Sequence, residues 1–167
     1  GAMLTHRSIM AVLAGAEGLL LGLTSGKETF LSMLPLSHAY EHSVGLLFPI
    51  HIRAEIYLLQ GPEALNSAIL ETRPTIMTAV PRLYEILQDR IQASYRHKGI
   101  IIRKMLDRAI YLGRKKLQKM PLTLFERIEN TYLNLTVRQH INQRLGGRLK
   151  ASVSGGAALD PDIGYFF

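Results

Sequence analysis

Residues 149–162 of this 167-residue chain read Leu-Lys-Ala-Ser-Val-Ser-Gly-Gly-Ala-Ala-Leu-Asp-Pro-Asp. The stretch up to Val153 predicts a short strand. Asp160 and Pro161 predict a helix start, because proline suits the first helical turn and acids suit its positive end. Gly155 and Gly156 stand at the turn between the two. Glycines there let backbone amides approach a ligand that a Cβ would keep away, so the turn is a candidate anion or nucleotide site.

The first half of the chain also alternates strand and helix patterns. Apolar, β-rich runs predict strands at 29–34, 55–59 and 75–80. Helical patterns lie around them at 6–23, 38–52, 62–72 and 81–96, the second interrupted by Pro49. Short links between strands and helices favour a parallel sheet flanked by helices, so the predicted fold class is α/β.

A mostly helical stretch follows, from Pro81 to Leu145, with breaks near Gly99 and Pro121. We expect one incomplete domain: an α/β part at 1–90, a helical, basic insertion at 91–145 and a return to α/β at 146–167. The chain stops barely one turn into its last predicted helix, so we expect a piece of a larger domain. Exposed sheet edges and apolar surface would then favour self-association.

The positive charge of the chain is concentrated in one stretch. The net charge is +7, and residues 96–119 hold nine basic residues against the single acid Asp107. Apolar residues recur there at steps of three and four, which predicts a basic amphipathic helix. Such a helix either packs on its own domain with a solvated face or contacts anionic lipid or another polyanion. The candidate membrane-facing bases are Arg103, Lys104, Arg108, Arg114, Lys115 and Lys116.

Composition narrows the classes of function. The chain has no cysteine, which excludes disulfides, thiolate metal ligands and a cysteine nucleophile. The apolar run at 9–23 holds Glu17 and three glycines and is too short to span a bilayer. No signal-peptide pattern precedes it. We expect a cytoplasmic protein that can lie peripherally at a membrane.

A second group of chemically active residues lies at 34–42, which read Leu-Pro-Leu-Ser-His-Ala-Tyr-Glu-His. His38 follows the first predicted strand, and open parallel sheets bind ligands beyond the carboxyl ends of their strands. There it would hydrogen-bond a substrate carboxylate or line a pocket, with a structural or capping role as the alternative. His42 comes one helical turn later, but without the Glu of the metalloprotease pattern, so we predict no metal site.

The strand predicted at 75–80 ends in the same way, with Pro81 opening a helix. In a parallel sheet, the strand ends after Leu34, Thr78 and Val153 open onto the same edge. We therefore expect these three ends to converge on one site.

Four segments resemble the adenylate-forming enzymes and, within them, the long-chain fatty acyl-CoA synthetases. Residues 1–7 resemble the segment after that family's phosphate-binding loop, and 34–41 resemble its Leu-Pro-Leu-Ser-His-x-x-Glu box. Residues 80–85 match its Val-Pro-Arg-Leu-x-Glu box, and 154–159 match its Ser-Gly-Gly-Ala-x-Leu turn. The four occur in the family's order at compatible spacing and cover essentially the whole chain.

The resemblance implies the large N-terminal domain of such an enzyme. It implies that a fatty acid is activated with ATP and Mg²⁺ to an acyl-adenylate. The acyl group is then transferred to the thiol of coenzyme A. His38 would line the acyl and adenylate pocket near the substrate carboxylate. Gly155, Gly156 and Ala157 would flank the adenine ring and acyl carbonyl. The acyl tunnel would lie beside Thr78, Ala79 and Val80.

The family's triphosphate-binding loop and its magnesium-binding Tyr-Gly-x-Thr-Glu box are not in this sequence. They would lie before Gly1 and after Phe167. We therefore expect no catalytic or metal-binding residue within the chain, and no adenylation by the chain alone.

Two alternative functions, each from another class of protein, remain open from the sequence. A nucleic-acid binder would explain the pI of about 9.9, but Tyr111 is the only aromatic inside the basic stretch and no nucleic-acid motif is present. A peripheral membrane module without enzymatic function would leave the His38 box and the Gly155 turn unexplained. Binding to DNA rather than anionic vesicles would favour the first, and vesicle binding by residues 96–119 alone the second.

Overall fold

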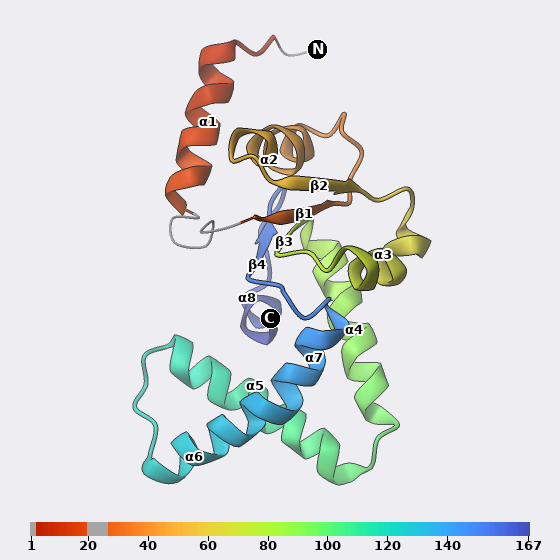
Figure 1. Ribbon diagram of the computed structural model, residues 1–167. Coiled ribbons are helices and arrows are strands. Elements are labelled where there is room, and N and C mark those ends of the chain that lie inside the picture. Colours follow the sequence, from red (N-terminus) through yellow and green to blue (C-terminus); the bar gives the residue numbers. More distant parts are fainter. Residues whose placement is uncertain (1–2, 20–26) are drawn as a thin grey trace.

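A four-stranded parallel sheet forms the centre of the protein (Figure 1). The computed structural model describes residues 3–19 and 27–167. The strands are β1 (Thr29–Ser32), β2 (Glu55–Leu58), β3 (Ile76–Ala79) and β4 (Ala151–Ser154), in the order β2-β1-β3-β4. Every neighbouring pair is parallel, with Phe30 opposite Ile76 and Ile76 opposite Ala151. The predicted α/β class is confirmed.

Helices cover both faces of this sheet. On one face lie α1 (His6–Leu19), the π-helix η1 (Glu41–Leu47) and α2 (Phe48–His51), whose core includes Leu13, Phe30, Phe48 and Ile76. The other face carries the 3₁₀ turn η2 (Pro62–Ala64), α3 (Leu65–Thr72), α4 (Pro81–Arg96) and α8 (Pro161–Phe166). Its core is formed by Leu31, Leu65, Ile69, Met77, Ala79, Tyr84, Leu87 and Ile163.

The alternating pleat explains this division. Successive side chains of a strand point to opposite faces, so Phe30 packs under α1 and α2 while Leu31 packs against α3 and α4. The predicted helix at 81–96 is confirmed as α4, and Pro81 occupies its first turn. The end of the predicted helix at 6–23 lies outside the described residues.

The prediction that Pro49 interrupts the helix at 38–52 is wrong. The backbone stays helical from η1 into α2, with both junction residues Leu47 and Phe48 in the α region. Pro49 is the second residue of α2. The wider hydrogen-bond spacing of the π-helix before it accommodates a residue without an N–H, so the chain continues without a break.

The crossover pattern places the topological switch point of the sheet between β1 and β3. The chain runs outward from β1 to β2 and then returns to the other side of β1 as β3. The helices that follow β1 cover one face, and α4, which follows β3, covers the other. Ligands of open α/β sheets bind at such a switch point, beyond the carboxyl ends of the strands.

A helical part with its own core extends from the second half of α4. It contains α5 (Ile100–Leu117), α6 (Leu124–Leu133), the π-helix η3 (Asn134–Arg138) and α7 (Gln139–Arg144), which lie below the sheet in Figure 1. Its core includes Ile91, Tyr95, Leu106, Ala109, Leu112, Leu133 and Val137. The predicted breaks near Gly99 and Pro121 are confirmed. Among the described helices, none has the length and apolar character needed to cross a bilayer.

Candidate functional site

The three strand ends meet beside Gly156. This glycine has φ of 81°, a left-handed conformation that suits glycine. A Cβ built on it would lie 3.6 Å from His38 Cε1 and 3.7 Å from Val80 Cγ1. His38 follows β1, Val80 follows β3 and Gly156 follows β4. The expected convergence of the three ends is therefore confirmed, at the switch point of the sheet.

The fully buried carboxyl group of Glu41 is hydrogen-bonded to two of these strand ends. Glu41, the first residue of η1, is 0% exposed. Its Oε1 accepts hydrogen bonds from Ser32 Oγ at 2.6 Å, the Met33 amide at 3.1 Å and Thr78 Oγ1 at 3.2 Å. The Oε2 atom is buried without a partner among the described residues. Glu41 therefore fixes the start of η1 to the ends of both β1 and β3.

The neighbouring Tyr40 makes the connection to β4. Its hydroxyl donates to the Val153 carbonyl at 2.9 Å, which also accepts from the Tyr84 hydroxyl at 3.2 Å. The Tyr40 ring lies against Gly155, where any Cβ would overlap it. The space above Gly155 is thus already occupied by a protein side chain. The absence of a Cβ at this position serves the packing of Tyr40.

Burial keeps both of these phenols protonated. It raises the pKa of Tyr40 above its ordinary value, with Glu41 as the smaller cause. Burial is also the main cause of the raised pKa of Tyr84. Both hydroxyls therefore act as hydrogen-bond donors over the physiological range of pH.

The imidazole of His38 is oriented by its own loop. Its Nδ1 lies 3.3 Å from the Tyr40 amide, from which it accepts a hydrogen bond. A neutral histidine that accepts at Nδ1 carries its proton on Nε2. The ring is exposed, so this arrangement presents an N–H donor at the strand ends that suits a carboxylate or phosphate oxygen.

The other predicted pocket residues lie in different surroundings. Thr78 and Ala79 are both fully buried, and they point to opposite faces of the sheet: Thr78 donates to Glu41, whereas Ala79 belongs to the core against α4. Val80 is partly exposed and Ala157 is exposed in the turn after β4. Of Thr78, Ala79 and Val80, only Val80 lies within contact distance of a Cβ built on Gly156.

Half of the predicted membrane-facing bases form ion pairs with acids of α6 and α8. Arg108 pairs with Glu129 at 2.9 Å, Lys115 pairs with Glu126 at 2.9 Å, and Arg114 pairs with Asp162. Arg103, Lys104 and Lys116 are exposed and form no ion pair in the described part of the chain. The charge of α5 therefore serves the packing of α6 and α8 as well as the surface.

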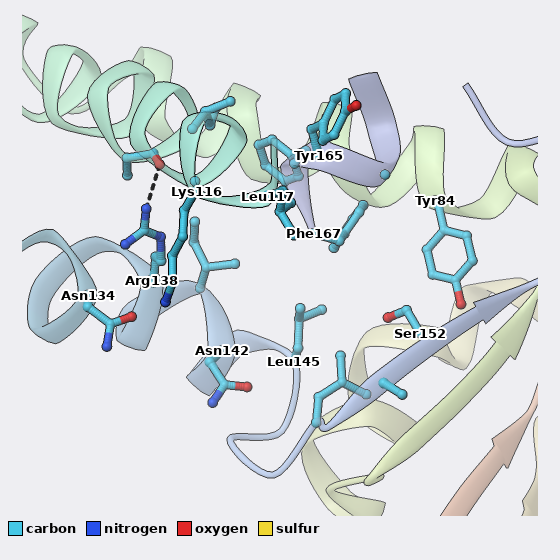
Figure 2. A pocket seen from close by; sticks show the side chains of 18 of the residues that line it. Tyr84, Lys116, Leu117, Asn134, Arg138, Asn142, Leu145, Ser152, Tyr165 and Phe167 are labelled. Atoms are coloured by element: carbon cyan, nitrogen blue, oxygen red, sulfur yellow. Dashed lines mark hydrogen bonds between the residues drawn. The ribbon is translucent and has the colours of Figure 1, made fainter. Parts of the chain in front are cut away.

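A cavity of about 590 Å³ lies on the other side of β4, between the sheet and the helical part (Figure 2). Tyr84 and Ser152 line its sheet side, and Lys116 and Arg138 line its helical side. Arg138 donates to the Ala109 carbonyl at 2.7 Å and to Asn130 Oδ1 at 2.8 Å. The cavity includes none of the seven predicted pocket and tunnel residues, so it is distinct from the site at the strand ends.

Sequence reasoning missed the two residues that hold the site together, Tyr40 and Glu41. Two signals were available for Glu41: it is the last residue of the Leu-Pro-Leu-Ser-His-x-x-Glu box, and it is the only acid between Glu28 and Glu55. Across the described residues, no group of three His, Cys, Asp or Glu side chains forms a candidate metal site.

Comparison with known proteins shows the family to which the chain belongs. The family model of the AMP-binding enzymes matches residues 1–167, and the chain therefore belongs to the AMP-binding enzyme family. It is 27% identical over 164 residues to the peroxisomal long chain acyl-CoA synthetase 7 of Arabidopsis thaliana, covering 98% of this chain and 22% of that protein. It is also 27% identical to fatty acyl-CoA synthetase A of Dictyostelium discoideum, covering 99% of this chain and 24% of that protein.

A third relative, long chain acyl-CoA synthetase 3 of Arabidopsis thaliana, is 28% identical over 171 residues, with 99% of this chain and 25% of the relative covered. The chain thus spans about a quarter of the length of these relatives. No solved structure matches the chain. The four resembling segments are accordingly those of a family member, and the named relatives are acyl-CoA synthetases.

Proposed function

We propose that this chain is part of an ATP-dependent long-chain fatty acid–CoA ligase and forms one wall of its acyl-adenylate pocket. The observation that carries the proposal is the meeting of His38, Val80 and Gly156 at the switch point of the sheet. Ligands of open α/β sheets occupy that position. The names of the relatives supply the substrate class, a fatty acid.

In this proposal each strand end has its own task. The Nε2–H of His38 donates to the carboxylate of the fatty acid or to its adenylate, because its Nδ1 is occupied by the Tyr40 amide. The turn at Gly155, Gly156 and Ala157 flanks the adenine ring and the acyl carbonyl. Thr78, Ala79 and Val80 lie beside the acyl tunnel, with Val80 nearest to the turn.

The cofactors of the proposed ligase are ATP, Mg²⁺ and coenzyme A. ATP supplies an AMP leaving group, which converts a poor electrophile into a reactive one, and coenzyme A supplies the accepting thiol. The open, left-handed turn at Gly156 fits close approach of an adenylate to the backbone. The described residues form no acidic cluster for Mg²⁺, so no step through the metal is assigned to them.

We further propose that residues 91–145 are an insertion into the α/β part formed by 1–90 and 146–167. The separate core of the helical part supports this division. We expect the 167-residue chain alone to be inactive, because the triphosphate-binding and magnesium-binding boxes of the family are not in its sequence. Fatty-acid-dependent exchange of pyrophosphate into ATP by the purified chain would contradict this expectation.

The test of the proposed function is binding of a non-hydrolysable acyl-adenylate analogue, an acyl sulfamoyl adenosine, to the purified chain. His38→Ala should weaken binding about tenfold, the effect of losing one hydrogen bond to a charged group. His51→Ala is the matched control, because His51 pairs with Glu17 on α1, away from the strand ends. Equal affinities of the two variants, or no binding at all, would contradict the proposal.

A further inference from the structure

Helix α6 and its continuation η3 carry an apolar stripe on their outer face. Its members are Leu124, Phe125, Ile128, Tyr132 and Leu135. Each is between 58% and 76% exposed. Their spacing of three and four residues places them on one side of the helix. The stripe is about 16 Å long, at 1.5 Å per residue.

The opposite side of the same helix is already buried. Leu133 and Val137 belong to the core of the helical part, and Glu126 binds Lys115 of α5. A surface helix of a globular protein normally has one apolar face and one polar face. This helix has two apolar faces, and among the described residues only the inner one is covered. The outer stripe is therefore a surface that a partner would cover.

The exposed charged residues of the segment that contains the stripe have one sign. From residue 115 to residue 138, the exposed charged residues are Lys116, Lys119 and Arg127. The two acids of this segment, Glu126 and Glu129, are turned inward in ion pairs with Lys115 and Arg108. Lys119 lies in the loop before α6 and Arg127 lies on α6 itself. Charge complementarity thus favours an anionic partner.

We propose that the stripe docks on an anionic lipid bilayer, with α6 lying in the plane of the interface. Large aliphatic and aromatic side chains on one face of a helix, flanked by free cations, bind membranes in this way. The apolar side chains enter the headgroup boundary, and Lys119 and Arg127 contact lipid phosphates. The contact surface is therefore centred on α6, and not on the α5 bases, of which three are paired. This inference goes beyond the proposed function and does not depend on it.

The chain has no tryptophan, so one introduced tryptophan reports its own surroundings. Tyr132→Trp places it in the stripe at a position 58% exposed. Leu70→Trp on α3, at a position 57% exposed, is the matched control. With vesicles containing phosphatidylglycerol, we expect a blue-shifted emission and quenching by brominated acyl chains for Tyr132→Trp alone. Equal responses of the two variants, or none, would overturn the proposal.

Substitutions of basic residues test the contribution of anionic lipid to vesicle binding. Lys119→Gln with Arg127→Gln should weaken vesicle binding about fivefold for each cation removed. The control Arg7→Gln with Arg53→Gln changes the net charge equally at exposed positions outside the helical part and should bind as the parent chain does. Equal losses in both pairs would overturn the proposal, because they would show a response to net charge alone.

A double substitution in the stripe and a DNA-binding measurement give two further outcomes that would overturn the proposed membrane docking. Phe125→Ser with Ile128→Ser should abolish vesicle binding while leaving the chain folded by circular dichroism. If this change instead abolished self-association, measured by light scattering, and left vesicle binding intact, the stripe would be a contact between copies. Retention on duplex DNA at the same salt concentration, without retention on vesicles, would identify a nucleic-acid surface.

Discussion

The Ser32 hydroxyl donates a 2.6 Å hydrogen bond to Glu41 Oε1, which joins the end of β1 to the start of η1 inside the protein. The same oxygen accepts from Thr78 at the end of β3. Tyr40, one residue earlier, is bound to Val153 of β4. Two adjacent residues therefore hold the His38 loop over all three strand ends.

Removing the Glu41 carboxyl group should destabilise the protein strongly. Glu41→Leu removes the acceptor of two buried hydroxyls, those of Ser32 and Thr78, and of the part-buried Met33 amide. Each such group costs about 1–3 kcal/mol, so the free energy of unfolding should fall by about 3 kcal/mol or more. Glu41→Gln keeps an acceptor oxygen and should cost less. Urea unfolding measures both.

The control for this change is Glu71→Ala, at an exposed position on α3. It should alter the free energy of unfolding by no more than about 0.5 kcal/mol. Similar stabilities for Glu41→Leu and Glu71→Ala would show that the buried carboxyl group does not hold the loop.

The two glycines of the turn should respond differently to alanine. Gly155→Ala forces a Cβ into the ring of Tyr40, so its cost should shrink when Tyr40 is replaced by serine. Gly156→Ala strains a backbone with φ of 81°, at a cost of about 1–2 kcal/mol that the Tyr40 change should leave intact. A double-mutant cycle for each glycine gives the comparison. Equal coupling of both glycines to Tyr40 would contradict this account.

The ion pair between Lys115 and Glu126 should make stability depend on pH. The Lys115 ammonium and the Thr123 amide lower the pKa of Glu126 from 4.5 to about 2. Because the pKa is lower in the folded protein, the stabilisation is complete above about pH 4.5 and disappears as the pH falls toward 2. Urea midpoints between pH 2 and 6 should fall less steeply for Glu126→Gln than for the parent chain. Glu63→Gln, at an exposed position, should follow the parent.

The tautomer of His38 can be observed directly. Its Nδ1 accepts from the Tyr40 amide, so neutral His38 should carry its proton on Nε2. Nitrogen-15 NMR of the neutral imidazole distinguishes the two tautomers by the shifts of the ring nitrogens. A proton on Nδ1 would mean that the hydrogen bond with Tyr40 is absent and that the Nε2–H is not available for a substrate oxygen.

Much of the fold could be predicted from local patterns. Apolar, β-rich runs located all four strands, and the start of α4 followed from Pro81. The convergence of the strand ends followed from parallel topology. The prediction that Pro49 interrupts its helix failed, because the change to π-helical spacing before it cannot be recognised from the residue types.

The contacts that complete the site were beyond local reasoning. The partners of Glu41 come from positions nine and 37 residues away, and a charged residue at a helix start is normally solvated. The pairing of Lys115 with Glu126 likewise depends on how α5 and α6 pack. Periodicity could show that α6 is apolar on two sides, but only packing determines which side forms the core.

The most direct test of the central claim is to map where an acyl sulfamoyl adenosine binds to the nitrogen-15-labelled chain, using amide chemical-shift changes. The account predicts changes clustered at His38, Val80, Gly155 and Gly156, with none at Lys116 and Arg138 in the cavity beyond β4. Changes centred on that cavity, or no changes at saturating ligand, would contradict the assignment of the strand ends as the acyl-adenylate pocket.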